Sequence, residues 1–177
     1  ERISSKLRAG AVHINGGGFN YGPLGMSHHT TEDIAIMRAI PNITVVVPST
    51  AWEAKHATKK LGKLKGISYL RIEKGGDNKP PFKNTKFKIG KHIVHRHGKD
   101  VCIITAGSII NECIDAANEL KKMDVSCKII SMPTIKPIDE RIILETAREF
   151  KNIITVEEHN RIGGLGGAVI GSVTASI

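Results

Sequence analysis

A run of β-branched residues at positions 43–47 constrains the possible folds most. Its letters are ITVVV, without the polar alternation of a strand that has one face in solvent. Such a run is typical of a strand buried on both faces of a parallel sheet. Directly after it, Thr50 and Glu53 form a capping box, whose hydroxyl and carboxylate can satisfy each other's backbone N–H groups and start a helix. A buried strand that leads directly into a helix indicates an α/β fold.

Strands and helices alternate along the rest of the chain. Before residue 74 the pattern predicts strands at 11–15, 43–47 and 67–72, and helices at 32–40 and 50–64. The stretch KGGDNKPPFKNTKFK at residues 74–88 is typical of a linker, because it combines glycines, a proline pair and lysines. After it the pattern predicts strands at 87–95, 101–106, 125–132 and 153–156, and helices at 108–123 and 139–150 and through residue 176. Ser108 and Asp139 are the expected N-caps of two of these helices.

The chain carries 26 lysines and arginines against 17 aspartates and glutamates, a formal net charge of +9. The lysines are spread over every segment, and aromatic residues make up only 4 %, too few for a base-stacking surface. For these two reasons we expect no nucleic-acid partner. The positive charge has another explanation, because a basic enzyme that handles phosphorylated substrates has the same charge balance.

The sequence contains no apolar run of about 18 residues, the length of a membrane span, and its start lacks the apolar core of a signal peptide. We expect a cytoplasmic protein without a membrane partner. Cys102, Cys113 and Cys127 lie in apolar segments and are expected to be reduced core residues.

Two adjacent histidines, His28 and His29, follow a glycine-rich stretch, YGPLGMS. Thr30 or Thr31 is expected to cap a helix that begins near Glu32, so the histidines would precede a helix N-terminus, whose dipole keeps an imidazole neutral. Gly22 and Gly25 allow a ligand to approach the backbone closely. The alternative is a glycine-rich turn that carries two surface histidines.

Four motifs together resemble the transketolase family of thiamine diphosphate enzymes. They are GMSHH at residues 25–29, MRAIPN at 37–42, TIKPID at 134–139 and TVEEHNRIGGLGGA at 155–168. The resemblance covers roughly residues 15 to 171 in the family's order. It implies an α/β fold with the partial parallel sheet of a pyrimidine-binding domain, followed by a compact three-layer α/β/α C-terminal domain with a mixed sheet. We place these parts at residues 1–74 and 89–177, with a linker at 75–88.

The resemblance also implies roles for individual residues. His28 matches the family histidine that moves protons beside the thiamine reaction centre, and His29, where relatives usually carry glutamine, is the second catalytic candidate. Tyr21, Gly22 and Gly25 are the expected cofactor-binding residues. No metal-ligating residue is expected in this chain.

Arg71 and Lys74 are the expected substrate-binding residues, because Lys74 falls where many relatives place an arginine that holds a substrate phosphate. The alternative is two cations that flank an exposed strand end. Leu24 stands where sugar-phosphate transketolases carry an aspartate that contacts a substrate hydroxyl. A branched or nucleotide-linked sugar is therefore at least as well supported as the ordinary substrates.

The resemblance implies thiamine diphosphate and Mg²⁺ as cofactors of the complete enzyme. The family's activating glutamate and the remaining strands of the pyrimidine-binding sheet are expected before residue 1, and the sequence lacks the family's Gly-Asp-Gly…Asn motif for diphosphate and magnesium. We expect the isolated chain to bind neither cofactor and to be inactive. Its expected partners are a diphosphate-binding domain or subunit of the same enzyme, a second copy in a homodimer, and a phosphorylated or nucleotide-linked sugar.

The function that these observations favour is the C-terminal part or subunit of an enzyme that transfers a ketol unit between sugars or sugar phosphates. Two alternatives stay open: the beta component of a 2-oxoacid dehydrogenase or a deoxyxylulose phosphate synthase-like enzyme, and a non-catalytic dimerisation or regulatory module.

Three further features are expected to be structural. His92, His95 and His97 do not share one strand face, so a zinc site is not favoured. The adjacent Glu157 and Glu158 are expected to be structural or interfacial. The glycine-rich turn at residues 163–167 lacks the spacing of a dinucleotide-binding loop, and close packing is favoured instead.

Overall fold

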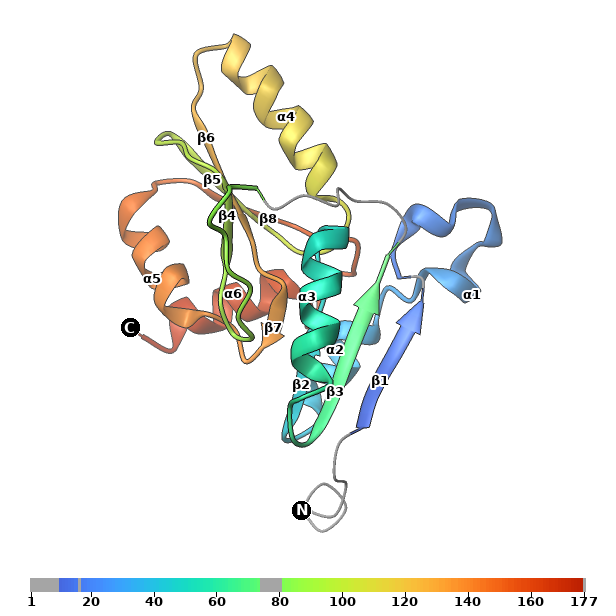
Figure 1. Ribbon diagram of the computed structural model, residues 1–177. Coiled ribbons are helices and arrows are strands. Elements are labelled where there is room, and N and C mark those ends of the chain that lie inside the picture. Colours follow the sequence, from blue (N-terminus) through green and yellow to red (C-terminus); the bar gives the residue numbers. More distant parts are fainter. Residues whose placement is uncertain (1–9, 16, 74–80, 177) are drawn as a thin grey trace.

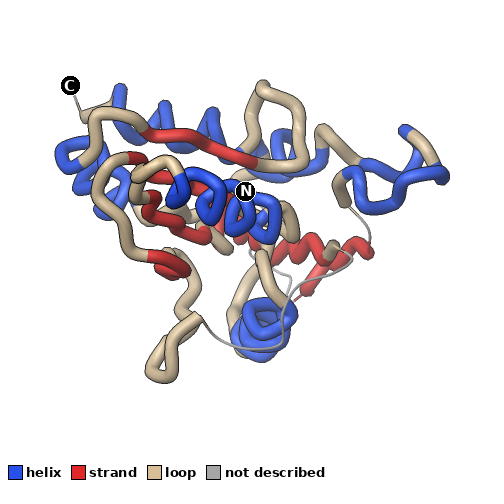
Figure 2. Tube along the Cα trace, turned by 90° about the horizontal axis from the view of Figure 1, so that it is seen from above, coloured by secondary structure: helices blue, strands red, loops and turns tan. Residues whose placement is uncertain are grey.

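The computed structural model describes residues 10–15, 17–73 and 81–176, which form two four-stranded sheets flanked by helices (Figure 1). Seen from above, the helices lie on both sides of the strands (Figure 2). The architecture is α/β, as predicted, and each sheet contains both parallel and antiparallel neighbours. None of the helices in the described ranges is long and apolar enough to cross a membrane.

The first sheet contains the three strands predicted before residue 74 and one strand that the sequence pattern does not predict. Its spatial order is β1 (Gly10–Asn15), β3 (Ile67–Ile72), β2 (Ile43–Val46) and β7 (Thr134–Lys136). β1 and β2 run parallel to β3, whereas β7 runs antiparallel to β2. Because β7 comes from the C-terminal part of the chain, the two parts share this sheet.

The second sheet is built entirely from residues after the predicted linker. Its spatial order is β4 (Ile93–Arg96), β6 (Cys127–Ser131), β5 (Val101–Thr105) and β8 (Ile153–Val156). β5 runs parallel to β6 and to β8, and β4 runs antiparallel to β6. The mixed sheet agrees with the prediction, although β4 is much shorter than the predicted 87–95.

Helices connect the strands in the predicted places, and two further short helices precede the first of them. In the described ranges they are η1 (Phe19–Leu24), α1 (Met26–His29), α2 (Asp33–Ala39), α3 (Ala51–Leu61), α4 (Ile110–Lys122), α5 (Glu140–Glu149) and α6 (Leu165–Thr174). η1 and α1 are absent from the predicted pattern.

The capping box of α3 forms with one change. The hydroxyl of Thr50 accepts the backbone N–H of Glu53 at 3.1 Å, as predicted. The carboxylate of Glu53, however, accepts the N–H of Ser49 at 2.7 Å, one residue before the expected donor. Glu53 is fully buried and also accepts a hydrogen bond from the ring of His95 at 3.0 Å. The cap of α3 therefore also contacts β4 of the second sheet.

Two other predicted caps are wrong, because long-range partners occupy the side chains. Ser108 donates its hydroxyl to Glu73 at 2.9 Å, and α4 begins two residues later without a side-chain cap. Asp139 accepts hydrogen bonds from the side chains of His92 and Lys91, at 2.9 and 3.2 Å, and makes no cap bond to α5.

One apolar cluster spans both sheets. It includes Ile34 and Val45 from the N-terminal part and Ile104, Ile130 and Leu165 from the C-terminal part. The three cysteines are also buried and unpaired, in agreement with the prediction.

Candidate functional site

The segment at residues 17–30 leaves the carboxyl end of β1 and projects beyond the first sheet (Figure 1). His28 and His29 lie in the last turn of α1, not in a turn directly before the next helix, so that prediction is wrong. The reason is Thr30, whose left-handed conformation (φ 45°) ends α1 before α2 begins at Asp33. The predicted threonine cap is also wrong, because the N-cap of α2 is Glu32, which makes no side-chain cap bond. In sheets with parallel strands, ligands bind beyond the carboxyl ends of the strands, which is where this segment lies.

His28 presents its ring to solvent. Its Nδ1 lies 3.0 Å from the hydroxyl of Ser27, and the ring of Tyr21 stacks against it with centroids 6.3 Å apart. Within the described residues, Nε2 has no hydrogen-bond partner. The structure thus leaves one ring nitrogen of His28 free to contact a ligand, with an aromatic ring beside it.

His29 is turned into the segment itself. Its Nε2 donates to the backbone oxygen of Gly22 at 3.2 Å, and its own backbone oxygen accepts the N–H of Gly18 at 2.7 Å. The ring of Phe19 meets it edge-on at 5.4 Å. All of these contacts lie within residues 17–30 and stabilise the conformation of this segment. They favour a structural role for His29 over direct catalysis.

Gly22 and Gly25 both have positive φ, 46° and 74°, and a Cβ at either position would meet no atom within 4 Å. Open space therefore adjoins the backbone on the side of both glycines. This space and the exposed ring of His28 belong to the same short stretch of chain.

The base of the segment is held by Arg71, whose predicted role is substrate binding, and by Glu158, whose predicted role is structural or interfacial. A Cβ on Gly17 would lie 1.7 Å from Nε of Arg71, and one on Gly18 would lie 2.0 Å from Oε2 of Glu158. The backbone N–H of Phe19 also donates to the Glu158 carboxylate. A larger residue at either position would displace Arg71 or Glu158, so the GGG stretch before η1 was the available sequence signal for this contact.

Arg71 is buried, with 1 % of its surface exposed, and lies in a cluster of acids. Its Nε is 3.5 Å from Oδ2 of Asp33 and 3.4 Å from Oε1 of Glu73, and its Nη2 donates to the backbone oxygen of Glu158 at 3.0 Å. Tyr69 donates its hydroxyl to Asp33. The arginine therefore joins β3 to α2 and to the C-terminal part, and it does not lie at an exposed strand end.

Asp33 and Glu73 form ion pairs with Arg71, and the charge of Arg71 also acts on the Glu158 carboxylate. Burial is the main influence on the pKa of Glu73 and on that of Glu158. Burial raises the pKa of Glu158, and the charge of Glu73 raises it further, whereas Arg71 lowers it. Burial likewise raises the pKa of Glu73 against the opposing effects of Arg71 and the Ser108 hydrogen bonds. Oε2 of Glu158 is buried and has no hydrogen-bond partner in the described ranges.

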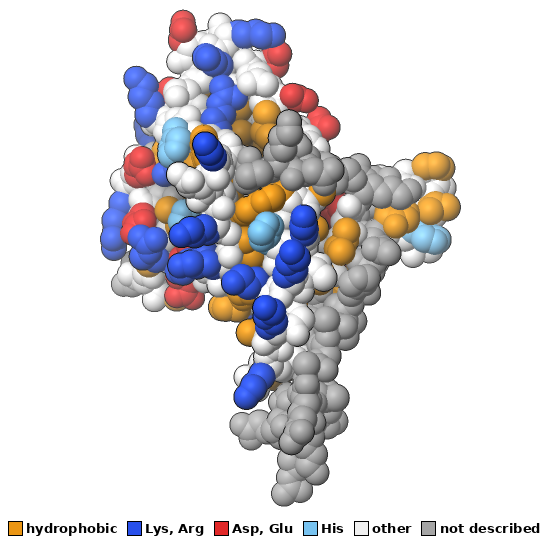
Figure 3. Space-filling view, viewed as in Figure 1, with side chains coloured by type: hydrophobic (Ala, Val, Ile, Leu, Met, Phe, Trp, Pro, Cys, Tyr) orange, Lys and Arg blue, Asp and Glu red, His pale blue; other side chains and the backbone are white. Residues whose placement is uncertain are grey.

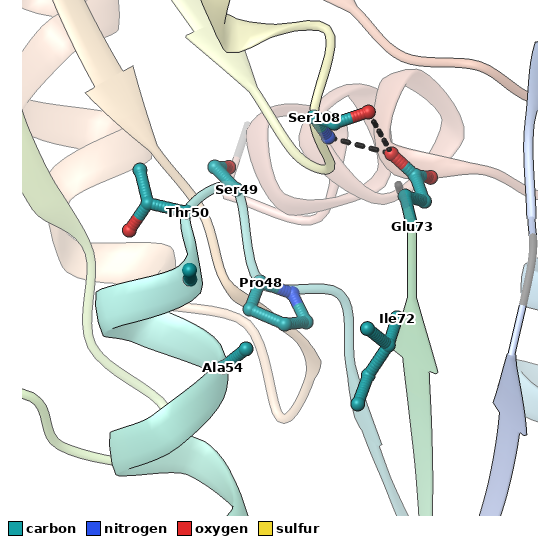
Figure 4. Close-up of a pocket in the computed structure, with 8 residues that line it drawn as sticks. Pro48, Ser49, Thr50, Ala54, Ile72, Glu73 and Ser108 are labelled. Atoms are coloured by element: carbon teal, nitrogen blue, oxygen red, sulfur yellow. Dashed lines mark hydrogen bonds between the residues drawn. The ribbon is translucent and has the colours of Figure 1, made fainter. Parts of the chain in front are cut away.

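A pocket of about 150 Å³ lies between the start of α3 and the Glu73–Ser108 pair (Figure 4). Pro48, Ser49 and Thr50 line one side of it. The described chain stops at residue 73 beside this pocket, and Lys74, the expected phosphate-binding residue, lies outside the described residues. The structure therefore does not place Lys74 relative to the histidines.

The remaining acid and glycine motifs have structural contacts. Glu157 accepts the N–H groups of Leu165 and Gly166, at 2.6 and 2.9 Å, and so caps α6. A Cβ on Gly163 would lie 2.6 Å from that of Ala35, which confirms close packing of the glycine-rich turn on α2. No group of three or more potential metal ligands occurs among the described residues.

Comparison with known proteins agrees with these elements. The family model described as the transketolase pyrimidine binding domain matches residues 3–76, and the one described as the transketolase C-terminal domain matches residues 90–176.

The chain belongs to the transketolase family.

A Methanocaldococcus jannaschii protein, provisionally named a transketolase C-terminal section, is 41% identical over 155 residues, which are 86% of this chain and 48% of that protein. One of the subunits of the apulose-4-phosphate transketolase of Phocaeicola vulgatus is 34% identical over 156 residues, 87% of this chain and 50% of that one. A solved structure described as a split gene transketolase, inactive beta4 tetramer, is 31% identical with a TM-score of 0.81, covering 93% of this chain and 53% of that chain. The chain spans about half the length of these relatives.

Proposed function

We propose that this chain is the C-terminal part or subunit of a transketolase-like transferase that moves a ketol unit between sugars or sugar phosphates. The exposed ring of His28 carries the proposal, because it lies beyond the carboxyl ends of the parallel strands with a free nitrogen. Family membership supports it, and so do relatives that are themselves named as a C-terminal section or as one subunit of a transketolase. The substrate, a phosphorylated or nucleotide-linked sugar, remains part of the proposal.

The described residues fit one side of thiamine diphosphate. His28, Tyr21 and the open backbone at Gly22 and Gly25 offer an imidazole, an aromatic face and room for close approach. In the described ranges no cluster of acids suits a diphosphate-bound Mg²⁺, so we assign that half of the site to a partner domain or subunit. When bound, thiamine diphosphate supplies the stabilisation of the carbanion formed on cleavage of a carbon–carbon bond next to a carbonyl.

His28 would then hold and return a proton at Nε2. A ketol transfer requires removal of a hydroxyl proton from one sugar and its return to the next, and imidazole can act in both directions near neutral pH. The Ser27 hydroxyl at Nδ1 fixes the ring orientation. His29 holds the segment in shape through Gly22, and Arg71 holds its base next to Gly17.

We further propose that the active assembly contains two copies of this chain and that it is cytoplasmic. A related chain is described as an inactive tetramer of β chains, which is consistent with self-association and with inactivity in the absence of a partner. Three buried, unpaired cysteines suit a reducing compartment.

The test combines this chain with its diphosphate-binding partner, thiamine diphosphate and Mg²⁺, and measures ketol transfer over a panel of ketose and aldose phosphates. His28→Ala should lower kcat by roughly a hundredfold or more. His97→Ala is the matched control, because His97 is exposed and its ring contacts Phe82, far along the chain from the site. A loss of less than about tenfold for His28→Ala would remove its proton-transfer role.

The non-catalytic module is the alternative from a different class. Titration of the isolated chain with thiamine diphosphate and Mg²⁺ by calorimetry, followed by addition of the partner, separates the two. If the assembled complex transfers no ketol unit although the partner binds this chain, the module is favoured. Transfer to lipoamide or condensation with pyruvate in place of ketol transfer would favour the 2-oxoacid dehydrogenase or deoxyxylulose phosphate synthase alternative.

A further inference from the structure

The outward side of α3 is rich in lysine. Its inner side packs on the core through Ala57 and Leu61, and Glu53 is fully buried beneath its first turn. Lys55 and Lys59 are one helical turn apart and both are exposed. Figure 3 shows a row of blue lysine and arginine side chains over α3, with no red side chain between them.

Residues 81–92, which precede β4, extend this surface. Phe87 is buried and belongs to the same apolar cluster as Ala57 and Leu61, so this stretch packs beside α3. The lysines around Phe87 point into solvent and add to the row. We call the combined surface the basic face, which consists of the exposed side chains Lys55, Lys59, Lys60, Lys63, Lys65, Lys83, Lys86 and Lys88.

Within the described residues, the lysines of the basic face have no acidic partner. Residues 54–72 and 81–99 contain no aspartate or glutamate. Among the described residues, none of the eight lysines takes part in an ion pair, whereas Lys122 on α4 pairs with Glu119, and Arg141 on α5 with Glu145. Part of the chain's excess positive charge is therefore concentrated on one surface, although its lysines are dispersed in the sequence.

The dispersed lysines of the sequence predict no nucleic-acid partner, but the tertiary structure gathers eight of them on one surface. We propose, against that prediction, that the basic face binds the phosphodiester backbone of a nucleic acid, independently of base sequence. Lysine is a point charge that pairs with phosphate without a fixed geometry, and a row of such charges suits a regularly charged strand. Among the described residues of this face there is no arginine to read base edges, which is why we infer backbone contact alone. The proposal does not rest on the proposed ketol transfer. These lysines lie on α3, just after it, and at residues 83–88, outside the segment at residues 17–30 that carries His28 and His29.

Two other occupants fit the surface less well. Protein interfaces are enriched in arginine and aromatic residues and depleted in lysine, the reverse of this face. A membrane-binding helix needs an apolar side that enters the lipid, but the apolar residues of α3 pack on the core. In the described part of the two segments, Phe82 is the only large apolar side chain that is prominently exposed, at 45 %.

The test measures binding of this chain to a short single-stranded RNA, the same sequence as DNA, and a DNA duplex, by fluorescence anisotropy. Salt is varied from about 50 to about 200 mM, because the salt slope counts the phosphates contacted. Lys59→Gln/Lys60→Gln/Lys63→Gln should raise Kd at least about tenfold and reduce the slope by about two. The RNA and DNA arms identify which backbone is preferred.

The matched control is Lys99→Gln/Lys121→Gln/Lys151→Gln, which removes three exposed lysines elsewhere and gives the same net charge. It should change Kd by less than about twofold if position decides binding. An equal loss in both variants, or no binding of the unmodified chain at low salt, overturns the proposal. So does equal competition by polyglutamate, which would favour an acidic protein, or binding only to phosphatidylserine vesicles, which would favour a membrane.

Discussion

Glu158 connects the C-terminal part of the chain to the segment that carries His28. Its carboxylate accepts the N–H of Phe19 and packs against Gly18, while its backbone oxygen accepts Nη2 of Arg71. A residue from the C-terminal part thus fixes the start of a loop that belongs to the N-terminal part. Sequence reasoning recognised that Glu158 is structural or interfacial but gave no partner for it.

We predict that Glu158→Ala loosens the histidine segment without unfolding the protein. Loss of a hydrogen bond to a charged group costs about 1.5–3 kcal/mol, so amides of residues 17–30 should exchange hydrogen about ten to a hundred times faster. Global stability should change less, because the ion pairs of Arg71 with Asp33 and Glu73 remain, and the variant removes a buried carboxylate oxygen that has no hydrogen-bond partner in the described ranges. Hydrogen exchange followed by mass spectrometry measures both.

Glu157→Ala is the adjacent control, since Glu157 caps α6 and does not contact residues 17–30 in the described structure. It should speed exchange at the start of α6 alone. Unchanged exchange of residues 17–30 in Glu158→Ala would show that Glu158 does not hold the segment.

At the scale of elements, the residues before the helices make either a local cap hydrogen bond or a long-range hydrogen bond in its place. Thr50 caps α3 as its sequence predicts, because both partners lie within one turn. Asp139 precedes α5 in the same way, yet it is buried and accepts hydrogen bonds from His92 and Lys91. It therefore ties the start of α5 to the chain before β4 instead of capping the helix.

We predict a pH-dependent role for Asp139. Burial by itself would raise its pKa, but the hydrogen bonds from His92 and Lys91 outweigh burial and lower the pKa below the usual value. A carboxylate whose pKa is lower in the folded state stabilises the fold above its unfolded pKa of about 3.9 and loses that effect as pH falls through the folded value.

Asp139→Asn should therefore reduce the free energy of unfolding by about 1–3 kcal/mol at pH 7, and the difference should shrink below about pH 4. Urea unfolding at several pH values provides the measurement. A difference that stays constant down to the lowest pH would assign the effect to geometry and not to charge.

At the scale of the whole molecule, the two parts are joined by several kinds of contact. β7 adds to the first sheet beside β2, and one apolar cluster includes side chains from both sheets. Arg38 donates to the backbone oxygens of Gly163 and Gly164 at 2.5 and 2.9 Å, and Lys136 donates to that of Ile40 at 2.6 Å. The division at residues 74 and 89 stays a prediction about domains, but the parts share a core.

We predict that the chain unfolds in urea as one cooperative unit. The single tryptophan, Trp52, reports on the first sheet, and Cys102, Cys113 and Cys127 report on the second. Burial raises the pKa of the Cys102 thiol to about 12, so its reactivity should appear only on unfolding. Tryptophan fluorescence and thiol labelling should give the same midpoint. Separate midpoints would show that the two sheets unfold independently.

The sequence by itself determined the order of the strands and helices apart from β7, η1 and α1, the Thr50 cap of α3, the buried cysteines and the family, because apolar periodicity, capping residues and motifs are local in the chain. It also identified the histidine pair. Only the tertiary structure decided that His28 faces outward while His29 turns inward, that Arg71 is buried among acids, and that β7 joins the first sheet. The orientation of the two histidines depends on how the segment at residues 17–30 folds on itself. The burial of Arg71 and the place of β7 depend on partners far away in sequence, and so do the hydrogen bonds that Asp139 and Ser108 make in place of helix caps.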